Sequence, residues 1–336
     1  GPGYEGWRFS NWQTNRHFSY VSESERDLLT DEMSAEWFEK KIDWIKQSQN
    51  NNQPFFIATG FIRPHTPLVV PKKYYDKFPL NKIKITEKLK DDLRDTKYSD
   101  NLKETRGHKA WRLLSEGYGS EEKGLKIFTQ AYLASVNFAD EMVGRVLDAL
   151  DKSSFAKNTI VILFSDHGYL LGQKDHLWKY NLWEETTRVP LIIRQPNNDN
   201  NAGKIVNHPV SLIDVFPTIS DYCSLEGNTL KSEKGKTPNG FSLKPFVEKP
   251  DLETWIGPEE ALTVVASWKS KLPEKQHLAI RTDRYRYIKY FDGSEELYDH
   301  EKDINEWENL AEDKDYREIV KEMRIRLQRR MDSYID

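Results

Sequence analysis

Two stretches of the chain carry apolar residues at helical spacing, and a short apolar run follows each of them. Residues 36–47 precede the run 54–60, and residues 123–150 precede the run 159–165. A period of three to four residues marks the buried face of a helix, whereas a short continuous apolar run is typical of a buried strand. Each pair therefore predicts a helix followed by a strand of an α/β sheet.

The regions around these pairs predict further elements. A strand is expected at residues 189–193 and a helix at residues 211–222. Residues 81–120 are dense in charge and show little periodicity, so they are predicted to form an exposed insertion. Residues 1–32 are polar and rich in aromatic side chains, which is typical of a loop that packs on other parts of a protein.

The pattern changes near residue 240. Residues 226–240 are rich in Lys, Gly, Ser and Thr, which indicates a linker. Beyond it, short runs typical of antiparallel strands are followed by one amphipathic helix. The strands are expected at 261–266, 278–281, 285–290 and 296–298, and the helix at 316–334. The sequence therefore predicts a domain of residues 1–240 and a smaller α+β subdomain of residues 241–336.

Composition narrows the class of protein. The chain has 336 residues, 37% of them hydrophobic, which suits one large domain with a smaller one attached. Its 50 Lys and Arg nearly balance 54 Asp and Glu, so a broad basic field for nucleic acid is not expected. No apolar run approaches the ~20 residues that cross a bilayer. The single cysteine, Cys223, excludes an internal disulfide and is expected to be buried.

The motif at residues 165–168, Ser-Asp-His-Gly, places Asp166 and His167 at the carboxyl end of a predicted strand. Ligands of open α/β sheets bind at that edge. A carboxylate there is unfavourable unless it is paired or binds a metal, and Asp with His forms half of a workable metal site. The alternative is an aspartate that caps a turn beside an unrelated histidine.

A second motif follows the run 54–60. In Arg63-Pro64-His65-Thr66-Pro67, two prolines hold His65 in a stiff loop. Such a histidine could act as a general acid or bind a substrate oxygen, with Arg63 nearby. A purely structural histidine is the alternative.

A third motif, residues 172–180, carries basic side chains among aromatic ones. Lys174, His176 and Lys179 would suit an anionic group beside a metal at Asp166. The alternative is a solvated surface, and Lys174 is expected to lie on one.

Together these motifs resemble the type I sulfatases of the alkaline phosphatase superfamily, and most closely the iduronate 2-sulfatase-like members. The resemblance runs from about residue 54 to the carboxyl terminus, and the motifs occur in the family's order. They lie at residues 55–60, 63–67, 130–136, 165–168, 178–180 and 188–191, followed by 281–287, 296–299 and 308–310.

The resemblance implies an α/β fold, the alkaline phosphatase-like sandwich. Its central mixed sheet lies between helices, and a small antiparallel subdomain with a terminal helix follows. The amino-terminal part of the sandwich is expected to be missing from this chain. A sheet truncated in this way would expose an edge and apolar faces. The chain is therefore expected to be poorly stable unless it pairs with the missing amino-terminal sulfatase portion, in the same chain or a separate one.

The resemblance also implies a reaction, the hydrolysis of a sulfate ester on a sulfated carbohydrate. In this family, formylglycine made from a cysteine or serine attacks sulfur, and a divalent cation stabilises the sulfate oxygens. Asp166 and His167 match two ligands of that cation. Calcium is expected, with magnesium or another divalent ion as the alternative, because an imidazole is an unusual ligand for calcium.

Two residues match substrate positions of the family. Lys179 is implied to contact the sulfate, and His65 to face the ester oxygen and assist the leaving group. His176 and Arg63 are further candidates for contacting the substrate. Arg188 is given a structural role. Location in the periplasm, outside the cell or in a lysosome would follow from the same resemblance.

One difference between this sequence and the family's motifs leaves the function open. The motif Cys/Ser-x-Pro/Ala-x-Arg is absent, because Cys223 is followed by Ser-Leu-Glu-Gly, and the paired-aspartate strand is absent too. No nucleophile is therefore assigned in this chain. The chain is expected to be the carboxyl-terminal portion of a sulfatase and to be inactive alone. The alternatives are a non-catalytic module that binds sulfated glycan or a partner, and a phosphate mono- or diester hydrolase.

Overall fold

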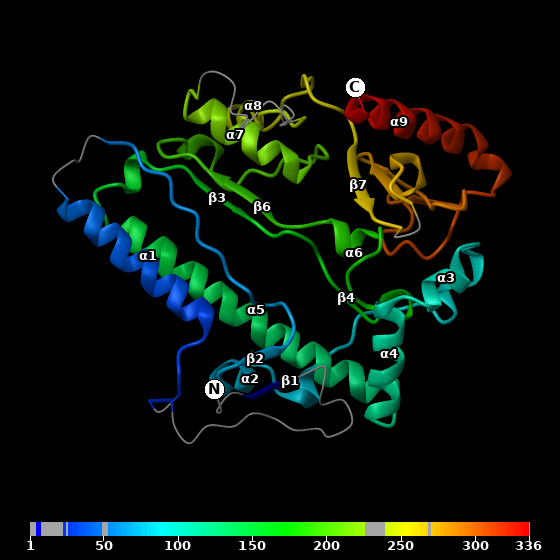
Figure 1. Ribbon diagram of the computed structural model, residues 1–336, viewed down its shortest axis with the longest axis horizontal. Helices are drawn as coiled ribbons and strands as arrows, with labels where there is room; N and C mark the ends of the chain where they lie inside the picture. Colours follow the sequence, from blue (N-terminus) through cyan, green and yellow to red (C-terminus); the bar gives the residue numbers. More distant parts are fainter. Residues whose placement is uncertain are drawn as a thin grey trace. The chain divides into compact units, whose positions relative to one another are not determined.

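The chain forms two compact units, shown in the computed structural model of Figure 1. The first comprises residues 1–87, 108–159 and 171–177, and the second residues 88–107, 160–170 and 178–336. The structure describes residues 5–7, 23–24, 26–48, 53–225, 239–267 and 270–335. Most of the aromatic-rich stretch 1–32 and of the predicted linker 226–240 lies outside the described residues. The division of the sequence at residue 240 stays a prediction.

The first unit is built on two helices that pack along one another, α1 (Thr30–Gln47) and α5 (Glu121–Asp151) (Figure 1). Ser120 caps α5 by accepting a hydrogen bond from the Lys123 backbone N–H, and two glutamates occupy its first turn. A small sheet of β1 (Glu5–Trp7) and β2 (Leu68–Val70) is antiparallel and also contacts α5. The two helices confirm the helical periods at 36–47 and 123–150.

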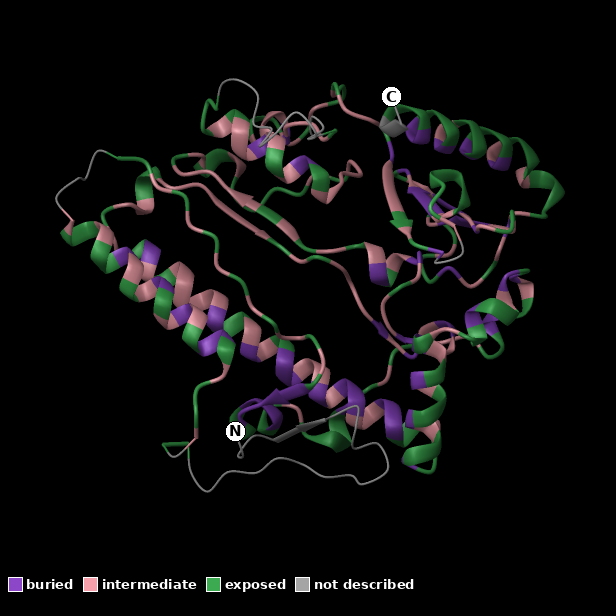
Figure 2. Ribbon diagram, in the orientation of Figure 1, coloured by how far each residue is buried: buried purple, intermediate pink, exposed green. Residues whose placement is uncertain are grey.

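The second unit contains a four-stranded antiparallel sheet in the order β10-β9-β8-β7. The strands are β7 (Ala261–Val265), β8 (His277–Arg281), β9 (Tyr285–Lys289) and β10 (Glu295–Asp299), and α9 (Arg317–Ile335) follows them. These bounds confirm the predicted strands and terminal helix to within two residues. Side chains alternate across a strand, so Leu278 and Ile280 join the apolar cluster of α9, whereas Ala279 joins a second cluster. Figure 2 shows the alternation of buried and exposed residues along α9.

The motif Ser165–Gly168 follows a separate pair of antiparallel strands, β3 (Val161–Phe164) and β6 (Leu191–Arg194). Both were predicted as strands, but the expectation that 159–165 is a fully buried strand is wrong. Phe164 is 47% exposed and Ile192 is 56% exposed. Two paired strands cannot cover both of their faces, so apolar side chains remain open.

Three other predictions need correction. Residues 54–60 form no strand, because no described segment pairs with them, and Phe56 is 73% exposed. Residues 81–120 were predicted to be exposed, but they include α3 (Ser99–Lys103) and α4 (Arg106–Gly117), and Leu93, Leu102 and Leu114 are buried. Tyr98 is buried and stacks on Tyr290, with ring centroids 4.1 Å apart. Cys223 is exposed, because it lies at the end of α7 rather than within it.

The remaining elements are short. They are α2 (Lys72–Asp76), β4 (Leu170–Leu171), β5 (Leu177–Trp178), α6 (Glu184–Thr187), α7 (Val215–Tyr222) and α8 (Lys244–Glu248), with several single-turn 3-10 helices. Among the helices of the described residues, none combines the length and the apolar character needed to cross a bilayer.

Candidate active site

Asp166 and His167 lie directly after the carboxyl end of β3. The backbone N–H of Ser165 still donates to the carbonyl of Pro190, at 3.3 Å, beside the start of β6. The Asp166 side chain is 80% exposed, and its Oδ2 atom lies 3.4 Å from Nε2 of His167. The two predicted metal ligands therefore share one turn, and the carboxylate is open to solvent.

The contacts of His167 define which ring nitrogen carries the proton. Nδ1 lies 2.8 Å from the carbonyl oxygen of Gly168, and Nε2 lies 2.6 Å from Nζ of Lys179. A carbonyl can only accept and an ammonium can only donate, so Nδ1 is protonated and Nε2 accepts. A backbone bond of this kind commonly orients a histidine whose other nitrogen binds a metal. The structure thus brings together Asp166, His167 and Lys179.

Lys179 sits in a turn with unusual backbone angles. Trp178 before it has φ 74° and Tyr180 after it has φ 71°, both in the left-handed region. Aromatic residues rarely adopt this region, so the surrounding structure must impose it, and such turns cluster at functional sites. The Lys179 ammonium also lies 5.7 Å from the centre of the Tyr180 ring.

The residues after His167 dock against α6 at very short range. The Gly168 N–H donates to the carbonyl of Thr186 at 2.9 Å, and the Tyr169 N–H donates to that of Glu185 at 2.7 Å. A Cβ atom added to Gly168 would lie 2.0 Å from the Glu185 carbonyl oxygen. Only glycine fits this approach, which fixes the Asp166–His167 turn to the segment that precedes Arg188.

Arg63 and His65 belong to the first unit, where Asp31 of α1 fixes their loop. The Asp31 carboxylate accepts hydrogen bonds from the backbone N–H groups of Ile62 and Arg63, both at 2.9 Å. Arg63 Nε donates to the carbonyl of Val69 at 3.1 Å. Burial lowers the pKa of Arg63, and the Asp31 charge opposes this shift. The guanidinium is thus used within its own loop.

His65 is exposed at the tip of this loop. Its Nδ1 donates to the carbonyl of Thr66 at 2.6 Å, which leaves Nε2 as the acceptor nitrogen. The peptide bonds Arg63–Pro64 and Thr66–Pro67 are cis. The backbone N–H of His65 donates to the carbonyl of Ile62 at 2.8 Å, which closes the turn that carries the histidine.

His176 differs from the other candidates because it is 1% exposed. Its Nδ1 lies 2.5 Å from the carbonyl of Lys174, and its ring centre lies 5.4 Å from that of His108. This geometry favours a structural role, and its contact with substrate stays a prediction. Lys174, expected on a solvated surface, is 3% exposed, so that expectation is wrong. A left-handed turn at Lys174 (φ 50°) accompanies this buried position.

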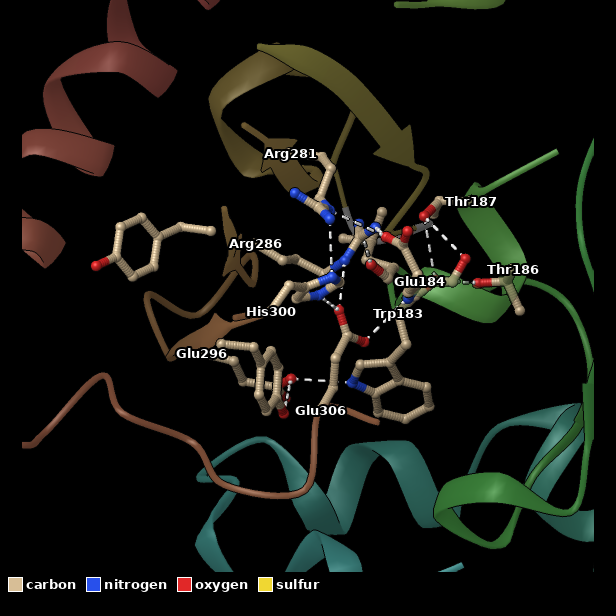
Figure 3. Close-up of polar contacts among 12 residues, drawn as sticks. Trp183, Glu184, Thr186, Thr187, Arg281, Arg286, Glu296, His300 and Glu306 are labelled. Carbon is tan, nitrogen blue, oxygen red and sulfur yellow. Dashed lines mark hydrogen bonds and ion pairs between the residues drawn. The ribbon is translucent and has the colours of Figure 1, made fainter. Parts of the chain in front are cut away.

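The sequence did not predict a buried polar network that lies in the second unit (Figure 3). Among the described residues, Glu184, His300 and Glu306 form a group whose ligand atoms lie close enough to hold a metal ion. Two arginines occupy the same group. Arg286 Nε lies 2.6 Å from Glu306 Oε1, and Arg286 also pairs with Glu184. Arg281 Nε lies 3.2 Å from Glu184 Oε2.

The proton positions in this network favour ion pairs over a metal. Arg281 Nη2 donates to His300 Nδ1 at 2.8 Å, so His300 Nε2 carries the proton and donates to Glu306 at 2.9 Å. Both ring nitrogens are therefore engaged, and two guanidinium charges balance two carboxylates. Burial alone would raise the pKa of Glu306, but Arg286 and His300 bring it below its usual value. A dication would have to displace an arginine from these carboxylates.

The family of the chain follows from comparison with known proteins. The sulfatase family model matches residues 2–224, and the model for the carboxyl-terminal part of N-sulphoglucosamine sulphohydrolase matches residues 172–333. The chain belongs to the sulfatase family. The resemblance drawn from the motifs is confirmed.

Two relatives by sequence and one by structure illustrate the match. A sulfatase of Formosa agariphila is 35% identical over 302 residues, which cover 89% of this chain and 53% of that protein. Iduronate 2-sulfatase of Mus musculus is 27% identical, over 82% of this chain and 59% of that protein. The phosphonate monoester hydrolase of Agrobacterium radiobacter has a similar structure, with TM-score 0.68 and 23% identity over 89% of this chain and 60% of that one. The expected fold class is confirmed. The chain spans about half the length of the curated relatives it matches.

Proposed function

We propose that this chain is the part of a sulfuric ester hydrolase that binds the sulfate group of a sulfated carbohydrate. The observation that carries the proposal is that Lys179 Nζ lies 2.6 Å from His167 Nε2, beside Asp166. All three residues lie in the part of the chain that matches the sulfatase family model. An ammonium beside an exposed carboxylate and an acceptor imidazole can hold an anion and a cation side by side.

In this proposal, Asp166 and His167 would hold a divalent cation, calcium in the first instance. Two features support that role: the Asp166 carboxylate is exposed, and a backbone carbonyl fixes Nδ1 of His167. Nε2 now accepts from Lys179, so a cation would take that lone pair as the ammonium turns to the sulfate. The cation, when bound, would supply positive charge to the sulfate oxygens. Lys179 would bind one of those oxygens through its ammonium.

Sulfate release from a sugar leaves an alcohol, whose oxygen needs a proton. We propose that His65 supports that step: with Nδ1 engaged by Thr66, its Nε2 would take a proton from solvent and pass it to the leaving oxygen. Arg63 and His176 stay proposed as further residues that contact the substrate. The attacking group is expected to be formylglycine from an amino-terminal segment. A sulfated saccharide is the proposed substrate, with the periplasm, the cell exterior or a lysosome as the proposed location.

The test is hydrolysis of a chromogenic aryl sulfate with calcium present, by this chain alone and with the amino-terminal sulfatase portion restored. Activity is expected only in the restored protein, and Asp166→Ala and Lys179→Ala should each abolish most of it. Lys157→Ala, which removes an exposed lysine of the single-turn helix 156–158 outside the proposed site, serves as the control and should leave activity unchanged. A restored protein that binds sulfated glycan but never turns over would favour the non-catalytic module.

A second candidate is a phosphate ester hydrolase. The phosphonate monoester hydrolase fold favours it, since the same scaffold carries that activity in a related structure. Turnover of an aryl phosphate in preference to the aryl sulfate by the restored protein would select this alternative.

A further inference from the structure

The buried network around Arg286 and Glu306 contacts the chain just after Lys179. Arg286 Nη1 donates to the carbonyl of Leu182 at 3.0 Å, and Glu306 Oε2 accepts from the backbone N–H of Glu184 at 2.9 Å. Between them, the Trp183 indole donates to Glu296 Oε2 at 2.9 Å. Three consecutive residues are thus held by three side chains of the carboxyl-terminal sheet and its following loop (Figure 3).

These contacts are buried, so water does not replace them readily. Arg286 and Glu306 are each 2% exposed, and Trp183 is also 2% exposed. Trp183 belongs to the same apolar cluster as Ile288 and Tyr298 of the sheet. A charged pair in such surroundings is held in one geometry, because either partner left alone would be a buried charge without compensation.

The segment held in this way connects the two halves of the proposed sulfate site. Lys179 precedes Leu182 by three residues, and α6 begins at Glu184. The carbonyls of Glu185 and Thr186 receive the N–H groups of Tyr169 and Gly168, which directly follow His167. A shift of residues 182–186 would therefore move Lys179 and the Asp166–His167 turn relative to one another.

We infer that Arg286 and Glu306 are positioning residues, which set the distance between Lys179 and His167 through residues 182–186. The inference rests on the proposed function, because it gives these residues a purpose in sulfate binding. It also explains why two arginines occupy a group of potential metal ligands: charge pairing there fixes a backbone segment, whereas the cation of the reaction belongs to the exposed Asp166–His167 turn.

Two variants test the inference in the protein with its amino-terminal portion restored. Glu306→Gln keeps the size of the side chain but removes the charge that Arg286 pairs with. Arg286→Lys keeps a positive charge, but its three donors sit on a single nitrogen, whereas Arg286 reaches Glu306, the Leu182 carbonyl and Glu184 through three separate nitrogens. Glu295→Gln is the matched control, since Glu295 lies in β10 and pairs with Arg324 of α9 rather than with residues 182–186.

Amide hydrogen exchange gives a readout that needs no activity. Both variants are expected to exchange the Gly168 and Tyr169 amides about tenfold faster than wild type, because α6 no longer holds its place. In Glu295→Gln these two amides should exchange as in wild type. Unchanged exchange at Gly168 and Tyr169 in both variants would overturn the inference.

Kinetics separates positioning from simple loss of folded protein. Misplacing Lys179 should raise KM for the aryl sulfate, and the inhibition constant of inorganic sulfate in parallel, by about tenfold or more. A merely structural role would reduce the active fraction, so kcat would fall while KM and the inhibition constant stay constant. That second result would overturn the inference. If the restored wild-type protein is inactive, the proposed function fails. The exchange experiment still tests the positioning role in that case, because it needs no activity.

Discussion

Replacing Gly168 by alanine should weaken both the fold of the second unit and the proposed site. The added Cβ would lie 2.0 Å from the Glu185 carbonyl oxygen and 3.0 Å from that of Arg188. The Glu185 carbonyl would have to withdraw by about 1 Å before carbon and oxygen reach a tolerable separation. The hydrogen bonds to Thr186 and Glu185, now 2.9 and 2.7 Å, would then exceed normal length.

The size of the effect follows from these contacts. Two lost hydrogen bonds cost about 1 kcal/mol each, and overpacking costs about 1–3 kcal/mol. Alanine also restricts the unfolded chain, which offsets about 0.4–1 kcal/mol. The free energy of unfolding of Gly168→Ala should therefore lie about 2–4 kcal/mol below that of wild type, measured by urea unfolding.

Gly144→Ala provides the matched comparison. Gly144 lies within α5, and a Cβ added there would meet no atom within 4 Å. The same substitution in a helix with open space should raise the free energy of unfolding by about 0.5–1 kcal/mol. Opposite signs at the two positions are the expected result. If Gly168→Ala unfolds at the wild-type urea concentration or above it, the close approach to Glu185 is not part of the folded protein.

Three further predictions concern other parts of the chain. Asp31→Asn should lower the free energy of unfolding by about 1–3 kcal/mol, because the ionised acceptor of the Ile62 and Arg63 N–H groups is lost. Hydrogen exchange of these two amides should become faster. Asp43→Asn, at an exposed position of the same helix, should change neither quantity. Because the pKa of Glu306 is lowered in the folded protein, its charge stabilises the fold above about pH 4.3, and this contribution is lost as pH falls through the folded pKa. The Tm of Glu306→Gln should therefore fall less steeply than that of wild type below about pH 4.3, and parallel Tm curves would contradict the assignment. Leu327→Ala should lower the free energy of unfolding, measured in urea, by about 2–5 kcal/mol, because Leu327 lies in the cluster between α9 and the sheet. Ile325→Ala, at an exposed position of the same helix, should stay within about 0.5 kcal/mol of wild type.

The carboxyl-terminal sheet and its helix were predictable from the sequence because their periods are local. Leu278 and Ile280 alternate with Ala279, and the apolar stripe of α9 repeats every three to four residues. Residues 54–60 failed as a strand because a strand also needs a neighbour, which a local pattern cannot supply.

The candidate site also has a part that the sequence predicts and a part that it does not. Asp166 and His167 could be found because they follow a strand in a recognisable motif, and Lys179 because its loop follows soon after. The Arg286–Glu306 pair could not be found, since its members lie in different elements and their burial depends on the tertiary fold. Charged residues in a sequence are ordinarily assigned to the surface, which also explains the error at Lys174.

The carboxyl-terminal sheet contributes none of the proposed catalytic groups, yet its side chains contact residues 182–184, which follow Lys179 closely in the chain. The two family models overlap at residues 172–224, the region that holds Lys179 and α6. In the structure, Arg286 and Glu306 of the second model's range contact Leu182 and Glu184 within that overlap. A subdomain that served only stability could pack through apolar side chains alone. Buried charges directed at the backbone of residues 182–184 instead fix its geometry, which is what the proposed binding of sulfate by Lys179 would require.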